Sequence, residues 1–167
     1  MKILYQGFPG AYSHLAAQEV FPRSKVLSCS TFEDCFKLCS ENKELKCIIP
    51  VENSIAGRVA DIQYLMNKYK LQISAEHFQL VSHNLISNKN TNLKKIKSVR
   101  SHSQAISQCN KIISKYKFST IVAADTAGSA KFISENKSKN EAAIASSLAA
   151  KIYNLKILKK NIEDESG

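Results

Sequence analysis

Short apolar runs alternate along the chain with longer stretches in which apolar residues recur every three or four positions. The short runs are typical of buried strands, and the periodic stretches are typical of helices that pack one face on a core. In the first part of the chain, strands are expected at 2–6, 25–29 and 47–49, and helices at 11–20, from Thr31 to beyond Cys39, and from Val59 to Tyr69. This alternation predicts a parallel sheet with helices on both faces.

Residues 71–86 depart from this order, because two strand-like stretches follow one another there without a helix between them. We interpret this segment as a crossing from a first lobe to a second. Beyond it, strands are expected at 96–99, 120–124 and 142–145, and helices at 103–116, 126–133 and 146–153, the last one capped by Ser146.

We therefore predict one α/β domain over residues 1–167, built as two lobes of mostly parallel sheets flanked by helices. Lobe 1 is expected to contain about 1–77 and about 156–167, and lobe 2 about 78–155. Ligands bind at the carboxyl ends of the strands in open sheets of this kind. The expected site is therefore a cleft between the lobes.

Composition narrows the class of protein. Hydrophobic residues make up 44% of the chain and charged residues 23%, which is the mix of a globular protein and not of a disordered one. The apolar start of the chain is too short for a secretory signal, and no apolar stretch has the length that spans a membrane. We expect a cytoplasmic protein without a membrane partner.

The formal net charge of +10 makes nucleic acid a tempting partner. However, the lysines between 89 and 97 and between 151 and 160 are not interleaved with aromatic residues, and tryptophan is absent. We interpret these lysines as solvated surface residues that attract acidic metabolites. No nucleic acid partner is expected.

The cysteines are odd in number and form no Cys-x-x-Cys pair; they are Cys29, Cys35, Cys39, Cys47 and Cys109. Cys35 and Cys39 lie four apart on an expected helix, where one face buries both. We interpret the cysteines as small buried hydrophobic residues of a reducing compartment. The four histidines show no ligand spacing with the thiols, so no metal site is expected.

Four polar loops stand where an expected strand passes into an expected helix, at 7–14, 50–57, 101–104 and 125–129. A helix start offers unpaired N–H groups and the positive end of a dipole, so it favours an anion. Several such starts in one crevice suit a small, multiply charged organic acid. Taken singly, each loop has a plainer explanation: a tight turn at Gly7-x-x-Gly10, a surface carboxylate at Glu52, and ordinary helix caps at Thr126 and Ser129.

Taken together, the motifs resemble those of prephenate dehydratases over nearly the whole chain. They are Gly-Phe-Pro-Gly-Ala-Tyr-Ser-His (7–14), Pro-Val-Glu-Asn-Ser-x-x-Gly (50–57), Val-x-Ser-His-x-Gln-Ala-x-x-Gln-Cys (99–109), Asp-Thr-Ala-Gly-Ser-Ala (125–130), Ala-Ala-Ile-Ala-Ser (142–146) and Tyr-x-Leu-x-x-Leu-x-x-x-Ile-Glu-Asp (153–164). The resemblance implies a fold similar to the type 2 periplasmic binding proteins, a homodimer, and loss of CO2 and water from prephenate to give phenylpyruvate. It also implies that no metal or organic cofactor takes part, because aromatisation of the ring drives the step.

The resemblance also implies roles for particular residues. The catalytic candidates are Asn53, Gln108, Ser101 and Glu52, and the substrate-binding candidates are Ser54, Thr126, Ser13 and His102. We expect four of these residues, with neighbouring N–H groups, to hold the carboxylates and the ketone: Asn53, Ser54, Ser101 and Thr126. Glu52 is expected to orient its neighbours, since an unpaired carboxylate would repel a dianion.

Two departures from the family pattern bear on activity. Ser103 stands where the family usually has proline, and Glu165-Ser166-Gly167 stands where the family continues toward a Thr-Arg-Phe segment and a regulatory domain. The resemblance implies that the threonine of this segment is the general acid that protonates the departing hydroxyl. Loss of a general acid typically lowers the rate roughly 10²–10⁴-fold. We expect a catalytic domain without these parts, weak or inactive but able to bind substrate. The alternatives are an arogenate dehydratase, or a non-catalytic module of the same fold that binds a small anion or an amino acid.

Overall fold

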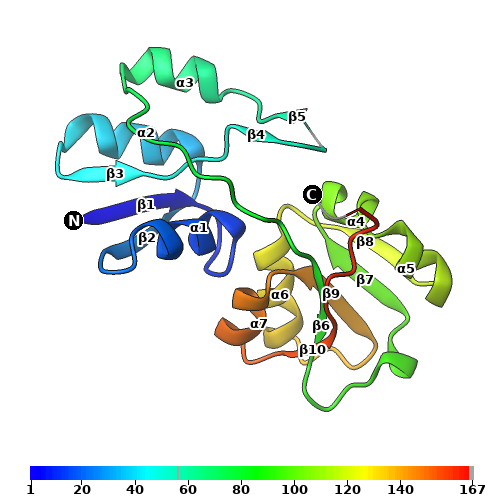
Figure 1. The fold of residues 1–167 in the computed structure, drawn as a ribbon. Helices are drawn as coiled ribbons and strands as arrows, with labels where there is room; N and C mark the ends of the chain where they lie inside the picture. Colours follow the sequence, from blue (N-terminus) through cyan, green and yellow to red (C-terminus); the bar gives the residue numbers. More distant parts are fainter. Residues whose placement is uncertain (56, 166–167) are drawn as a thin grey trace. The chain divides into compact units, whose positions relative to one another are not determined.

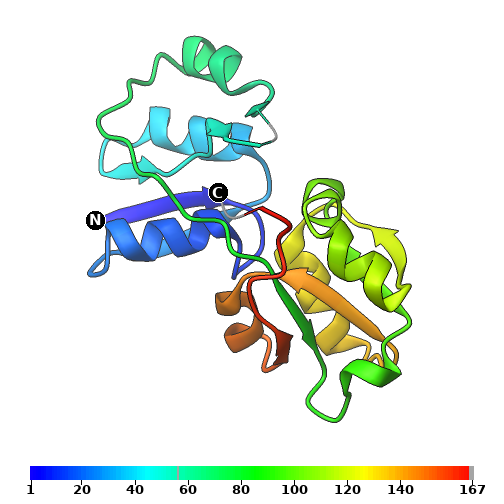
Figure 2. The same ribbon diagram turned by 45° about the vertical axis from the view of Figure 1, so that its right-hand side comes forward.

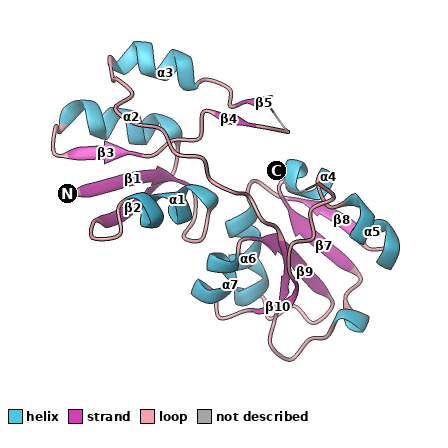
Figure 3. Ribbon diagram, viewed as in Figure 1, coloured by secondary structure: helices cyan, strands magenta, loops and turns pink. Residues whose placement is uncertain are grey.

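The computed structural model describes residues 1–55 and 57–165 of the chain and divides them into two compact units (Figure 1). Unit 1 contains Met1–Phe8 and Tyr12–Leu80. Unit 2 contains the short segment Pro9–Ala11 and the chain from Val81 onward. Each unit has its own sheet and its own core and is described by itself (Figure 3).

The sheet of unit 1 has three parallel strands in the order β2-β1-β3. The strands are β1 (Lys2–Gln6), β2 (Lys25–Cys29) and β3 (Leu45–Cys47). The helices are α1 (Tyr12–Val20), α2 (Phe32–Glu41) and α3 (Ile62–Tyr69). Side chains alternate between the two faces along a strand. Tyr5 of β1 stacks on His14 of α1, while its neighbour Leu4 clusters with Cys35 of α2, so α1 and α2 cover opposite faces.

Local chemistry explains where α2 begins. Thr31 is its N-cap: the Thr31 hydroxyl accepts a hydrogen bond from the Asp34 N–H at 3.0 Å, and the Asp34 carboxylate accepts one from the Thr31 N–H at 3.0 Å. This is the reciprocal capping arrangement that satisfies two N–H groups of a helix start. Beyond α2, α3 packs on its outer side through Phe36, Ile62 and Leu65.

A two-stranded antiparallel hairpin, β4 (Glu52–Asn53) and β5 (Gly57–Arg58), follows the first sheet in the chain. The Val59 N–H donates to the Val51 carbonyl at 3.0 Å and extends the pairing by one bond. The hairpin carries three of the predicted site residues.

Unit 2 is built on a five-stranded mixed sheet in the order β10-β6-β9-β7-β8. Its strands are β6 (Asn84–Ser87), β7 (Ser98–Ser101), β8 (Ser119–Val122), β9 (Glu141–Ala145) and β10 (Lys156–Lys159). Strands β9, β7 and β8 are parallel, whereas β6 runs antiparallel to both of its neighbours. The helices are α4 (Ser103–Ser107), α5 (Asn110–Tyr116), α6 (Thr126–Glu135) and α7 (Ser147–Ile152), with a short 3-10 helix at Leu93–Lys95. The fold is therefore α/β with mostly parallel pairing.

Two apolar clusters form the core of unit 2. One contains Leu85, Val99 and Ile113, and the other contains Ile86, Ile133 and Ala149. Leu85 and Ile86 are consecutive residues of β6, so the clusters lie on opposite faces of the sheet, which is covered on both sides. Figure 2 shows α6 and α7 on a different side of this sheet from α5.

Three expectations need correction. Residues 71–83 form no regular strand, and three of their apolar side chains, Ile73, Phe78 and Leu80, are at least 64% exposed. The expected helix over 103–116 is two helices, α4 and α5, separated at Gln108 and Cys109. The segment from residue 156 lies in unit 2 and not in the first lobe, because β10 pairs with β6.

Candidate active site

The carboxyl ends of three parallel strands bring polar residues to one edge of the unit 2 sheet. Ser101 ends β7, Thr126 follows β8, and Ser146 follows β9. The amino end of β6 lies at the same edge, because Asn84 pairs with Ala145 in antiparallel register. This edge is the place where open α/β sheets bind their ligands.

Ser101 is fully buried at this edge. Its hydroxyl donates a hydrogen bond to the Ile144 carbonyl at 2.7 Å, and its own carbonyl accepts from the Ala123 N–H at 2.8 Å. A serine hydroxyl has one proton, and here that proton holds the end of β7 against β9. Ser101 therefore fixes the geometry of the edge, and its hydroxyl has only acceptor capacity left in this arrangement.

Gln108 ends α4 and reaches back to the start of β6. Its side-chain carbonyl oxygen lies 2.9 Å from His83 Nε2, and because that oxygen is an acceptor, His83 Nε2 is the donor. His83 is 3% exposed, and burial lowers its pKa below the ordinary value, which keeps the ring neutral at neutral pH. The backbone N–H of His83 separately donates to the Glu163 carboxylate at 2.9 Å.

His102 and Thr126 both stand at helix starts. His102 is the N-cap of α4, and its Nδ1 accepts from the Gln104 N–H at 3.3 Å. Thr126 is the first residue of α6, which Asp125 caps by accepting from the Gly128 N–H. The capping role expected for Thr126 therefore falls to Asp125, so the Thr126 hydroxyl is not needed as the cap.

The first polar loop also contributes to the edge of unit 2. The Ser146 hydroxyl, which follows β9, donates to the Gly10 carbonyl at 2.6 Å. Gly10 has φ +94°, and an added Cβ would lie 2.6 Å from the Ala149 Cα. A residue with a side chain does not fit there, so the second glycine of Gly7-x-x-Gly10 has a packing requirement beyond an ordinary turn.

The other predicted residues lie in unit 1. Ser13 is in the first turn of α1, after the carboxyl end of β1. Glu52, Asn53 and Ser54 lie on the hairpin that follows β3, and Glu52 and Ser54 are exposed. The Asn53 side-chain oxygen accepts from the Ile55 N–H at 3.0 Å, which shapes the turn between β4 and β5.

The structure therefore groups the eight predicted residues into two sets. Ser101, His102, Gln108 and Thr126 share the edge of unit 2, and Ser13, Glu52, Asn53 and Ser54 follow the carboxyl edge of unit 1. The sequence did not indicate His83, Asn84 or Glu163 as part of the first set. Of these, only Glu163 belongs to a motif, and no local pattern shows that the tail returns to His83.

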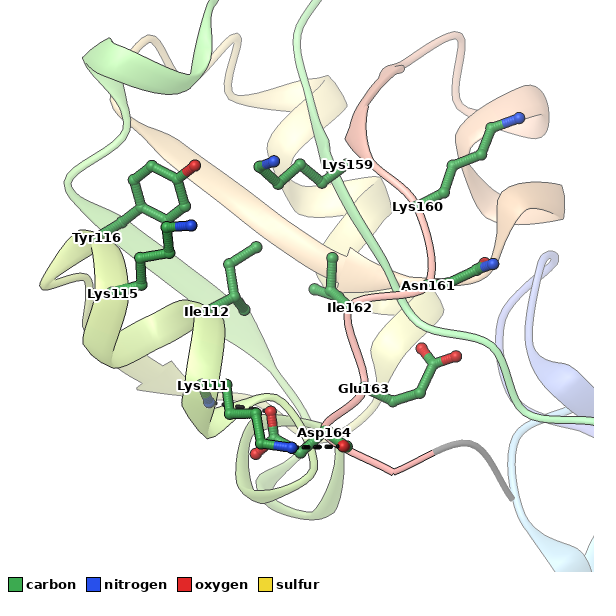
Figure 4. A pocket seen from close by; sticks show the side chains of 10 residues that line it. All are labelled: Lys111, Ile112, Lys115, Tyr116, Lys159, Lys160, Asn161, Ile162, Glu163 and Asp164. Carbon is green, nitrogen blue, oxygen red and sulfur yellow. Dashed lines mark hydrogen bonds between the residues drawn. The ribbon is translucent and has the colours of Figure 1, made fainter.

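A surface groove of about 310 Å³ lies on unit 2, lined by Lys111, Ile112, Lys115, Tyr116, Lys159, Lys160, Asn161, Ile162, Glu163 and Asp164 (Figure 4). None of the eight predicted residues lines it. Across residues 1–55 and 57–165, no His, Cys, Asp and Glu side chains are grouped so that they could hold a metal ion. Within the same residues, no helix is long and apolar enough to cross a membrane.

Comparison with known proteins decides the family. Residues 3–167 match the family model described as prephenate dehydratase. The chain belongs to the prephenate dehydratase family. Among curated relatives, it is 37% identical over 162 residues to the bifunctional N-acyl-homoserine lactone acylase/prephenate dehydratase of Komagataeibacter europaeus, covering 97% of this chain and 58% of the relative. It is 32% identical over 166 residues to arogenate dehydratase 2 of Petunia hybrida, covering 99% of this chain and 42% of the relative.

Solved structures agree on the fold of this prephenate dehydratase domain. A structure described as a novel type of quorum-quenching acylase is 36% identical, with a TM-score of 0.91, over 98% of this chain and 60% of the other. The prephenate dehydratase of Arthrobacter aurescens in complex with L-Phe is 22% identical, with a TM-score of 0.89, over 99% of this chain and 57% of the other. At that identity the second likeness shows the fold alone. The chain spans between 42% and 58% of the two curated relatives named above.

Proposed function

We propose that this domain carries out the decarboxylating dehydration of prephenate to phenylpyruvate, a step toward L-phenylalanine. The observation that supports it most is the set Ser101, His102, Gln108 and Thr126 at one carboxyl edge, in a chain that matches the family from residue 3 onward. The proposed reaction needs neither metal nor organic cofactor, because formation of the aromatic ring drives loss of CO2 and of the ring hydroxyl.

The proposed roles follow from the hydrogen bonds of the edge. The Gln108 oxygen is held by His83, which leaves the Gln108 amide N–H groups as oriented donors for the substrate. Thr126 supplies a hydroxyl, and the start of α6 supplies N–H groups that favour a carboxylate. Fixed donors of this kind stabilise charge that develops in a transition state by several kcal/mol. Ser101 acts by holding β7 against β9.

Asn53 and Ser54 are proposed to bind the substrate from unit 1. The Asn53 oxygen already shapes the hairpin turn, so its amide group is held in a defined orientation. Glu52, an exposed carboxylate next to them, is proposed to orient neighbours. Glu52 is not proposed as a base, because an unpaired carboxylate close to the substrate would repel a dianion.

Turnover of single variants tests the assignment. Asn53→Ala and Gln108→Ala are each expected to lower kcat/KM for phenylpyruvate formation by roughly 10²-fold, as loss of one preorganised donor does. Ser107→Ala, at an exposed neighbouring position of α4, serves as the control and should keep the parent rate. The thermal stability of each variant is measured alongside. Near-parental rates in both Asn53→Ala and Gln108→Ala would refute the assignment.

Prephenate carries a ketone where arogenate carries an amino group. The names of curated relatives mention both substrates. Parallel assays with the two substrates decide between them through the ratio of kcat/KM values. A non-catalytic module would instead be stabilised in thermal shift by phenylalanine alone, without stabilisation by prephenate.

A second candidate activity is hydrolysis of N-acyl-homoserine lactones. It is favoured by two comparisons, the Komagataeibacter europaeus relative and the quorum-quenching acylase structure. Release of homoserine lactone from an acylated substrate, measured on the same protein preparation, tests it directly. Release at the rate of a no-enzyme control would exclude this activity.

A further inference from the structure

The surface groove of unit 2 is formed by two segments that lie far apart in the chain. Helix α5 supplies one wall, and the end of β10 with the residues that follow it supplies the other. Ile112 and Ile162 contribute apolar side chains, and Ile162 is buried. The volume of about 310 Å³ is at the lower end of the range for pockets that hold small molecules. The groove therefore has the size of a site for a small ligand.

Positive charge exceeds negative charge in this groove. Both of its carboxylates already accept backbone N–H groups. Glu163 accepts from His83 at 2.9 Å, and Asp164 accepts from Lys111 at 2.9 Å. Among residues 1–55 and 57–165, no ion pair involves any of the four lysines that line the groove, which are Lys111, Lys115, Lys159 and Lys160. Four ammonium groups against two carboxylates leave a net charge of +2.

Two of the ammonium groups share one aromatic ring. The Nζ atoms of Lys115 and Lys159 lie 5.9 Å and 6.0 Å from the centre of the Tyr116 ring, and Figure 4 shows both side chains extended toward it. Stacking on Phe118, with 5.4 Å between the ring centres, holds this ring in place. Two like charges at one ring repel each other, and an anion bound between them relieves the repulsion.

Asn161 adds a neutral donor to the same wall as Lys159. Its side-chain oxygen accepts from the Ser82 hydroxyl at 2.8 Å. This bond orients the side chain and leaves its amide N–H groups as donors for a ligand. The groove thus combines cations, an amide donor and apolar side chains, which suits an anion with an apolar part.

We propose that the groove binds a small phosphate monoester that carries an apolar group. A phosphate monoester has a charge of about −1.5 to −2 at pH 7, which matches the excess of positive charge. Lysine binds phosphate as a point charge, whereas carboxylates are matched best by the fork of an arginine, and the described lining residues include no arginine. The phosphate lies between Lys115 and Lys159, and the apolar group lies on Ile112 and Ile162. This binding is independent of the dehydratase reaction.

Phenyl phosphate is the probe. It is titrated at pH 7 and constant ionic strength into the isotope-labelled full chain, and the amide NMR shifts are followed. A Kd of about 1 mM is expected for a ligand of this size. The shifts should be concentrated in residues 111–116 and 159–164. Shifts concentrated at residues 101–102 and 126–129 would place the probe at the candidate active site and overturn the proposal.

Charge-removing variants identify the side chains that bind the probe. The double variant Lys115→Gln/Lys159→Gln should weaken the binding of phenyl phosphate roughly tenfold, as loss of two exposed charge contacts does. The matched control Lys94→Gln/Lys151→Gln removes the same charge from exposed positions that do not line the groove, and it should keep the parent affinity. Thermal unfolding checks that each variant is folded. Equal losses of affinity in the two double variants would show only general attraction by a positive protein and would overturn the proposal.

Two related probes test the chemistry of the ligand. Phenyl sulfate has a similar shape and a single negative charge, and inorganic phosphate lacks the apolar group. Both should bind at least about threefold more weakly than phenyl phosphate, because each lacks one of the two contributions. Equal affinity for phenyl sulfate would contradict a site for a dianion. Equal affinity for inorganic phosphate would contradict the contact of an apolar group with Ile112 and Ile162.

Discussion

Gly10 illustrates how one residue without a side chain holds a loop in place. The Ser146 hydroxyl bonds to its carbonyl, and its Cα faces the backbone of α7 closely enough that a Cβ would lie 2.6 Å from the Ala149 Cα. The neighbouring atoms are backbone and a short Cβ, so they have no flexible end that could move aside. At this position the constraint is space as much as backbone conformation.

Gly10→Ala is therefore expected to destabilise unit 2. The forced contact should cost about 1–3 kcal/mol, as overpacking does, in addition to about 1–2 kcal/mol for the left-handed backbone. Gly57→Ala is the matched control, since Gly57 has φ +81° but, among the described residues other than its chain neighbours, no atom lies within 4 Å of an added Cβ. Thermal unfolding measures both variants. Equal losses of stability would show that the close approach to Ala149 carries no cost.

His83 should make stability depend on pH. Burial is the main cause that lowers its pKa, while Gln108 and the Glu163 carboxylate oppose the shift. Because the pKa of His83 is lower in the folded chain, the unfolded chain binds a proton first as the pH falls. The stability that the neutral His83 ring contributes is therefore present above about pH 6.5 and is lost as the pH falls through the pKa of the folded state. His83→Gln should weaken this loss between pH 7 and pH 5 in urea unfolding. The free energy of unfolding at pH 8, where the ring is neutral in both the folded and the unfolded state, is the reference. If the free energy of unfolding fell with pH equally steeply in variant and parent, His83 would not be the cause of the pH dependence.

At the scale of elements, an ion pair joins two strands of the unit 2 sheet. Arg100 of β7 donates through Nε to the Glu141 carboxylate of β9 at 2.5 Å, and its guanidinium lies 4.0 Å from the centre of the Phe132 ring of α6. The two side chains are 20% and 12% exposed. Because solvent screens this pair little, it contributes more than a surface pair does.

Glu141→Gln should lower the free energy of unfolding by about 1–2 kcal/mol, since Arg100 then keeps its charge without a carboxylate. Glu135→Gln removes the carboxylate of an exposed ion pair with Lys131, whose atoms lie 3.7 Å apart, and should change stability by less than about 0.5 kcal/mol. Urea unfolding of the two variants provides the comparison. A loss in Glu135→Gln as large as that in Glu141→Gln would contradict the argument.

Elements with a local signal could be predicted from the sequence, and those held by distant contacts could not. Thr31 and Ser146 were expected as caps from their own neighbourhoods, and both cap their helices. The division of the expected helix 103–116 has a distant cause: the Asp164 N–H donates to the Gln108 carbonyl at 2.7 Å, and its carboxylate accepts from the Lys111 N–H at 2.9 Å. Asp164 is 53 residues from Lys111, so no local pattern indicates this cap.

The same distinction applies to the candidate site. The loops that carry Ser101, His102 and Thr126 were indicated because they follow expected strands, and parallel strands end at one edge of a sheet. The roles of the individual residues were implied by the family resemblance. His83 and Gly10 reach that edge through Gln108 and Ser146, which are 25 and 136 residues away in the chain. Their place depends on packing that no short window of the sequence contains.

At the scale of the whole molecule, 24 Lys and Arg residues against 14 Asp and Glu residues give a net charge of +10. A positive protein raises the local concentration of anions and speeds their association. The effect reaches about 30 Å at 0.01 M salt and about 8 Å at 0.15 M, so it weakens strongly across that range. The proposed substrate carries two carboxylates, so the positive protein should attract it more strongly than a ligand with one carboxylate.

The association rate of prephenate should therefore fall by about tenfold between 0.01 M and 0.15 M salt, within the range known for electrostatic steering. Phenylpyruvate, with a single carboxylate, is the matched ligand and should show a shallower dependence. Stopped-flow binding at constant viscosity measures both rates. Equal slopes for the two ligands would mean that the surface lysines do not attract the substrate, and binding would then depend on the short-range donors of the site alone.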